Sequence, residues 1–104
     1  MQKTLNFCDQ IHNVNPTLSD IEEKLLALDT SKNDGFLIYE EEGGSFVQAQ
    51  GDKDIGFLIE YHNSANSLSL QTRDRLDSEI ALSIFSNFMS GDVAWISKHE
   101  MHDL

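Results

Sequence analysis

The residues that could bind a metal are concentrated near the C-terminus, where His99 and His102 stand on either side of Glu100. A helix would place histidines three residues apart on one face, as metal ligation requires. The zinc-protease pattern is H-E-x-x-H, however, and "HEMH" is one residue short of it. Structural zinc takes four ligands, and this pair supplies only half of them. The sequence therefore predicts no metal site here.

A second candidate for metal binding is "GDKDIG", in which Asp52 and Asp54 flank Lys53. The spacing resembles the start of a calcium loop, which requires D-x-[DN]-x-[DN]-G. The fifth position of that pattern would be Gly56, which has no side chain to offer. A turn that carries two solvated carboxylates is the better interpretation.

Residues for covalent or acid–base catalysis are equally poorly supported. Cys8 lies in a polar N-terminal segment, and no G-x-S-x-G motif or phosphate-binding glycine loop occurs in the sequence. Glu60 stands inside an apolar stretch, where strand alternation turns it toward solvent. We therefore expect no catalytic residue and no cofactor, and a binding protein rather than an enzyme.

Net charge is the strongest compositional signal, because 18 acidic and 7 basic residues leave the chain at −11. Nucleic acids and anionic membranes are bound by Lys and Arg side chains that displace counterions, so this balance argues against both as partners. Residues 20–60 hold eleven acids and three lysines, and the densest run is Glu40–Glu42. Such a run either keeps a turn exposed to solvent or attracts a basic protein through its long-range electric field.

Two segments have the apolar spacing of helices. The first should begin at a capping box formed by Ser19 and Glu22 and end near Asp29. The second should run from Asp77, as its cap, to about Ser90. Their apolar stripes are Ile21, Leu25 and Leu28 in the first helix and Ile80, Ile84, Phe85 and Phe88 in the second.

Strands are expected between these helices, in "GFLIYEE", "SFVQAQ", "GFLIEYH" and "SLSLQT". Short connections favour an antiparallel meander. In the third strand, alternation places Phe57, Ile59 and Tyr61 on one face and Leu58, Glu60 and His62 on the other. The sequence predicts a single α+β domain over residues 1–104, a four-stranded antiparallel meander flanked by an N-terminal and a C-terminal helix (α-β-β-β-β-α). Consecutive turns of a meander lie at opposite ends of the sheet, so Glu40–Glu42 and Asp52–Asp54 need not form one patch.

The aromatic residues suggest anchors for a partner. The tail beyond Gly91 should pack through Val93, Trp95 and Ile96. A lone tryptophan beyond a helix covers the edge of a core in the simpler interpretation, but tryptophan is also enriched in interface hot spots. If either is exposed, Tyr39 or Trp95 would supply the apolar anchor.

The cysteine content and the lack of long apolar segments bear on the cellular compartment. It has one cysteine, no run of about 20 apolar residues, and no apolar segment in "MQKTLNFCDQIHNV" at its N-terminus. We expect a cytoplasmic protein.

The stretch "GFLIEYHNSANSLSLQTRDRLDSEIALSIFSNFMSGDVAW" resembles the first-numbered immunity family of bacterial polymorphic toxin systems. The likeness rests on the glycine-led strand turns, an acid-rich helix, and a Phe…Gly…Trp ending at Phe88, Gly91 and Trp95, and it covers residues 34–95. Members of that family look like cytoplasmic α+β proteins that bind and neutralise a toxin delivered by a neighbouring cell. Such toxins are often basic enzymes that act on nucleic acid. The resemblance implies no catalytic residues.

Together these observations predict a bacterial immunity protein that inhibits its cognate toxin by occupying the toxin surface. The partner would be a basic toxin domain, and a homo-oligomer stays open. The predicted partner-binding residues are Glu40, Glu41, Glu42, Asp52, Asp54, Tyr39 and Trp95. The alternative is an acidic adaptor or secretion-chaperone-like module that binds a protein segment at its sheet edge.

Overall fold

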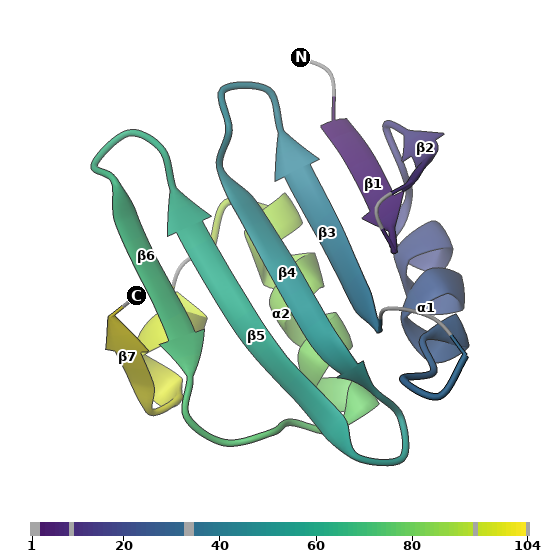
Figure 1. Ribbon diagram of the computed structural model, residues 1–104. Helices are drawn as coiled ribbons and strands as arrows, with labels where there is room; N and C mark the ends of the chain where they lie inside the picture. The colour runs from purple at the N-terminus through teal and green to yellow at the C-terminus, as the bar shows by residue number, and fades with distance from the viewer. Residues whose placement is uncertain (1–2, 9, 33–34, 93, 104) are drawn as a thin grey trace.

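A computed structural model describes residues 3–8, 10–32, 35–92 and 94–103, and for residues 10–13 it describes the backbone alone. Within these residues the strands form one antiparallel sheet in the order β2-β1-β3-β4-β5-β6-β7 (Figure 1). The elements in chain order are β1 (Lys3–Phe7), β2 (Gln10–Val14), α1 (Leu18–Ala27), β3 (Phe36–Glu41), β4 (Phe46–Asp52), β5 (Gly56–Asn63), β6 (Leu68–Thr72), α2 (Ser78–Met89), the 3-10 helix η1 (Ala94–Lys98) and β7 (Met101–Asp103).

The predicted α+β class with an antiparallel sheet and two helices is confirmed, but the predicted four-stranded sheet is too narrow. The expected meander is β3 to β6. The β1–β2 hairpin extends it beside β3, and β7 extends it beside β6. Sequence patterning gave little sign of these strands, because β7 has three residues and only Leu5 and Phe7 of β1 are apolar.

Both helices cover the same face of the sheet, and the other face carries no helix (Figure 1). Strand alternation fixes which side chains form the core. Phe57, Ile59 and Tyr61 of β5 are buried on the helix side, as predicted, while Leu58, Glu60 and His62 alternate with them. The same alternation in β3 and β4 buries Leu37, Tyr39, Val47 and Ala49. These residues pack against Ile21 and Leu25 of α1 and Ala81, Ile84, Phe85 and Phe88 of α2.

The N-cap of α1 lies two residues before the expected cap, so the predicted Ser19–Glu22 capping box is wrong. Thr17 is the N-cap: its Oγ1 accepts a bond from the Asp20 N–H (3.2 Å), and the Asp20 carboxylate accepts one from the Thr17 N–H (2.8 Å). The sequence "TLSD" thus forms the reciprocal box two residues earlier than "SDIE". Ser19 lies exposed within the first turn of the helix.

Helix α2 agrees with its prediction at both ends. The Asp77 carboxylate accepts a hydrogen bond from the Ile80 N–H (2.8 Å), and Ser90 is the C-cap. The expected apolar stripe is wrong at one position, since Ile80 is exposed and Ala81 is buried in its place. Neither described helix is long and apolar enough to cross a membrane.

The tail follows α2 and returns to the sheet. In η1, Trp95 is buried and Ile96 packs partly against the core, as expected. The expected contribution of Val93 lies outside the described residues. Strand β7 then pairs with β6 through Met101 and Thr72.

The capping geometry can be tested with two single substitutions. Thr17→Ala should lower the free energy of unfolding by about 1 kcal/mol, because it leaves the Asp20 N–H without its side-chain acceptor. Ser19→Ala should stay within about 0.5 kcal/mol of the parent protein, because it changes an exposed position inside the helix. Urea unfolding at neutral pH measures both. A larger loss for Ser19→Ala than for Thr17→Ala would contradict the observed start of the helix.

Candidate functional site

A concavity of about 430 Å³ lies at the turn between β3 and β4, and its lining includes all three residues of the acidic run. The turn is closed by backbone hydrogen bonds from the Gly44 N–H to the Glu41 carbonyl (3.0 Å) and from the Glu41 N–H to the Ser45 carbonyl (2.9 Å). Gly43 and Gly44 have φ values of 105° and 100°, which residues with a side chain rarely adopt. The lining residues are Thr4, Glu40, Glu41, Glu42, Gly43 and Gly44.

The three glutamates reach this concavity from different directions. Glu40 lies opposite Thr4 of β1 and Phe46 of β4, on the sheet face that carries no helix. Glu41 alternates to the helix side, where its carboxylate lies 3.8 Å from Lys3 Nζ. Glu42 is exposed in the turn. A partly exposed ion pair of this kind contributes little stability, so Lys3 only partly offsets the local negative charge.

Asp52 does not belong to an accessible acidic surface, and the expectation of a solvated carboxylate there is wrong. One carboxylate oxygen accepts bonds from the Thr30 N–H (3.1 Å) and the Thr30 hydroxyl (2.9 Å). The other accepts bonds from the N–H groups of Asp54 and Ile55, each at 3.0 Å. Four donors occupy the carboxylate, and Asp52 is only 7% exposed. It fastens the loop after α1 to the end of β4.

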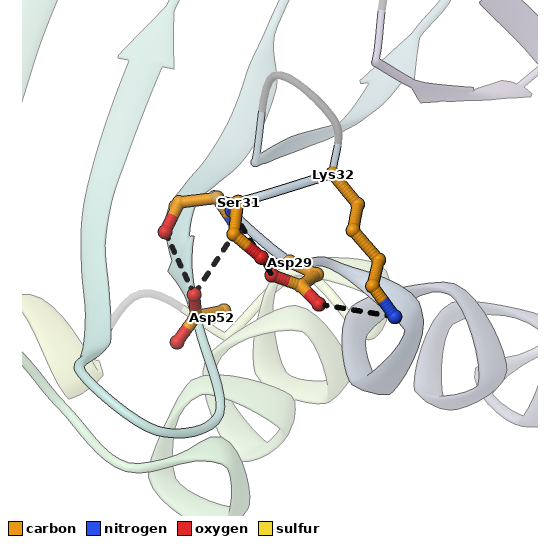
Figure 2. Close-up of polar contacts among 5 residues, drawn as sticks. Asp29, Ser31, Lys32 and Asp52 are labelled. Atoms are coloured by element: carbon orange, nitrogen blue, oxygen red, sulfur yellow. Dashed lines mark hydrogen bonds and ion pairs between the residues drawn. The ribbon is translucent and has the colours of Figure 1, made fainter.

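These donors stabilise the ionised form of Asp52. They lower the pKa of its carboxyl from 3.8 to about 2, with the bond from Ile55 as the largest cause and those from Thr30 next. The neighbouring turn is ordered in a similar way. Asp29 accepts bonds from the Ser31 hydroxyl (2.6 Å) and N–H (3.0 Å), which lower the pKa of Asp29, and it lies 4.0 Å from Lys32 Nζ. Figure 2 shows Asp52 directed at this turn and the Asp29–Lys32 pair beside it.

Asp54 is exposed, but it lies far from the glutamates. The β4–β5 turn that carries it is at the opposite end of the sheet from the β3–β4 turn (Figure 1). The two predicted acidic turns are therefore separate features, as the meander topology implied.

Tyr39 and Trp95 are buried, so the expectation of an exposed anchor at either residue is wrong. Tyr39 is 0% exposed because it alternates in phase with Leu37 and faces the helices. Its ring meets Phe88 edge-on at 5.8 Å, and Trp95 meets Tyr61 edge-on at 5.6 Å. Burial, and secondarily the charge of Glu41, raises the pKa of Tyr39 to about 12. Both aromatic residues contribute to the core.

Sequence reasoning overlooked an aromatic pair on the open face of the sheet. Phe46 and His62 are cross-strand neighbours whose rings stack with centroids 5.3 Å apart and planes inclined by 26°. Nδ1 of His62 lies 2.7 Å from the Ser69 hydroxyl, which holds the imidazole in place. A signal for this face was present in "GFLIY", because a strand that is apolar at every position has apolar side chains on both faces.

The other chemical candidates stay apart. Cys8 is a free, half-buried thiol whose Sγ lies 3.7 Å from the Phe36 carbonyl oxygen. His99 is half-buried just before β7, and His102 is exposed within it. In the part of the chain that the structure describes, no three His, Cys, Asp or Glu side chains come together as a metal site would require.

The chain matches no family model, and neither a curated protein nor a solved structure matches it.

The role of Asp52 predicts how stability depends on pH. Its folded pKa of about 2 lies below the ordinary value of 3.8, so the native state binds fewer protons than the unfolded state between these values. The stabilisation is present above about pH 4 and should be lost as the pH falls toward 2. Urea unfolding of the parent protein between pH 2 and 7 should show this fall.

Asp52→Asn is the direct test, and Asp54→Asn is its control with the same change in charge. Asp52→Asn should unfold at a lower urea concentration at neutral pH, because an amide NH2 replaces one acceptor oxygen. Its free energy of unfolding should also fall less steeply below pH 4. Asp54→Asn should keep the parent slope, since the Asp54 side chain is exposed. Equal slopes for the two variants would contradict the assigned role of Asp52.

Proposed function

We propose that this protein is an immunity protein that binds a cognate bacterial toxin and inhibits it by occupying its surface. The observation that carries the proposal is the concavity lined by Glu40, Glu41 and Glu42. The net charge of −11 and the resemblance of residues 34–95 to an immunity family support it.

The physical basis is charge complementarity. An enzyme that cleaves nucleic acid presents Lys and Arg side chains to phosphates, and carboxylates at similar spacing bind the same groups. The three glutamates gather negative charge around a hollow into which a long basic side chain can reach. The overall negative charge also accelerates encounter with a basic partner, most strongly at low salt.

The proposed mode of action is binding without catalysis. The glutamates act as fixed charges, and inhibition is stoichiometric because one bound protein covers one toxin surface. The toxin would be met in the cytoplasm, where it acts on nucleic acid. No cofactor or metal has a role in this mechanism.

The alternative function, an adaptor that binds a segment at the sheet edge, would have to use strands other than those first expected. Strand β1 covers the outer side of β3, and β2 pairs with β1. On the other side β7 covers β6, so the edges of the described sheet are β2 and β7. An extended segment adding to β2 could pair along five residues, whereas β7 offers three.

Co-expression with the product of the adjacent gene tests the proposed function. The account predicts that the two proteins co-purify in a 1:1 ratio and that this protein abolishes the toxicity of its partner. Failure to co-purify together with undiminished toxicity would overturn the immunity function. Co-purification of a non-toxic protein that protects β2 from hydrogen exchange would favour the adaptor.

The acidic turn can be tested by charge reversal. Replacing Glu40 and Glu42 by Lys should slow association with the basic partner on the order of ten-fold at low ionic strength, with a smaller effect at high salt. The control is Glu22→Lys with Glu23→Lys, which changes the net charge equally at exposed positions on α1. Stopped-flow or surface-based kinetics measure both. Equal slowing by the two variants would mean that overall charge, and not this turn, governs association.

A further inference from the structure

The face of the sheet opposite the helices is open (Figure 1). Four large apolar side chains of the central strands point to this face and are half-buried: Phe36, Ile38, Phe46 and Leu58. The solvent face of an antiparallel sheet ordinarily carries polar side chains. These side chains alternate across the strands with the polar Gln48 and Gln50 of β4, so the face offers both apolar and polar contacts to another protein.

Cross-strand register joins this face to the acidic concavity. Thr4 lies opposite Glu40, Glu40 opposite Phe46, and Phe46 opposite His62. Side chains directly opposite one another on adjacent strands have Cβ atoms about 5 Å apart. Thr4 and Glu40 also line the concavity, so one cross-strand row of side chains runs from the concavity to the stacked Phe46–His62 pair.

A second row adds another carboxylate. Glu60 lies opposite Gln48, which in turn lies opposite Ile38. Glu60 is thus a diagonal neighbour of Phe46, at a Cβ separation of about 7 Å. The aromatic pair therefore has a carboxylate on each of two sides, from Glu40 and Glu60.

Positive charge is missing from this face in the described strands. Lys3 is the one basic residue within them, and it faces the helix side beside Glu41. A face with apolar side chains, a fixed aromatic pair and carboxylates complements a cation that is both flat and weakly hydrated. Arginine fits this description better than lysine, because its guanidinium stacks on aromatic rings and forms paired hydrogen bonds with a carboxylate.

We propose that the open face binds a protein segment in which an arginine stands next to an apolar residue. The guanidinium stacks on Phe46 and hydrogen-bonds to Glu40 or Glu60, while the apolar neighbour packs on Ile38 and Leu58. The His62–Ser69 contact holds the aromatic pair in position before binding, which lowers the entropic cost of association. Where the segment belongs to a toxin, the proposal rests on the proposed function and identifies the apolar half of that interface.

Two other occupants fit this face less well. A second copy packed face to face would bring Glu40 and Glu60 toward equivalent carboxylates, with no lysine or arginine on the open face of the described strands to pair with them. A nucleic acid would bring phosphates to the same carboxylates. A basic protein segment is the occupant that relieves this repulsion.

The probe is an acetylated, amidated hexapeptide of alternating arginine and leucine, compared with its lysine–leucine counterpart. Titration of the isotope-labelled protein, followed by NMR, gives both the position and the affinity of binding. The arginine peptide should shift the resonances of Phe46, His62 and Glu60 and bind at least about three-fold more tightly than the lysine peptide. Equal affinities, or shifts confined to α1 and α2, would overturn the proposal.

Substitutions separate the ring from general hydrophobicity and charge. Phe46→Leu keeps an apolar side chain but removes the aromatic face, so the arginine-to-lysine affinity ratio should fall toward one. Glu60→Gln should weaken arginine-peptide binding at least about two-fold. The controls are Leu26→Ala and Glu79→Gln, at exposed positions on the helix layer, and both should keep the parent affinities and ratio.

The outcomes also distinguish this surface from the proposed function. Selective peptide binding, with no protection by this protein against the toxicity of the adjacent gene's product, would support the surface and overturn the immunity function. Toxin inhibition that is unchanged by Phe46→Leu and Glu60→Gln would leave the immunity function intact and exclude this surface from the toxin interface.

Discussion

The alternation of side chains in β3, β4 and β5 is the constraint on which the rest of the structure depends. Leu37 and Tyr39 pair in register with Ala49 and Val47, which pair with Ile59 and Tyr61. A slip of one residue in any of these strands would turn its core residues outward and its outer residues toward the helices. The two helices then cover one face only, so every outward residue of these strands meets solvent or a partner.

That constraint separates core residues from outward-facing residues among side chains that look alike in the sequence. Tyr39 and Phe46 are both aromatic strand residues, yet Tyr39 packs on Phe88 in the core and Phe46 stacks on His62 at the open face. Asp52 and Glu40 are both acids near the end of a strand. Asp52 is occupied by four donors, whereas Glu40 lines a concavity. The core and the open face thus use the same residue types, and the strand alternation decides which residue goes to which face.

Much of the central architecture could be predicted from local patterns. Helix α2 and the four meander strands are defined by strong periodicity, capping at Asp77 and glycine-containing turns, which are properties of neighbouring residues. The features that were missed depend on residues distant in the sequence. The role of Asp52 is set by Thr30, and the edge strands β1 and β7 are stabilised by pairing with β3 and β6. At α1, two overlapping capping patterns occur, and only the contacts distinguish Thr17 from Ser19.

Side-chain footprinting of the complex with the adjacent gene product tests the central claim most directly, namely that the acidic concavity and the open face together form the binding surface. Hydroxyl-radical oxidation, read by mass spectrometry, reports the accessibility of individual side chains with and without the partner. The account predicts that Phe36, Phe46 and Leu58 become protected while Leu26 and Ile80 on the helix layer stay as reactive as before. Protection of Leu26 and Ile80 with no change at Phe46 would contradict it.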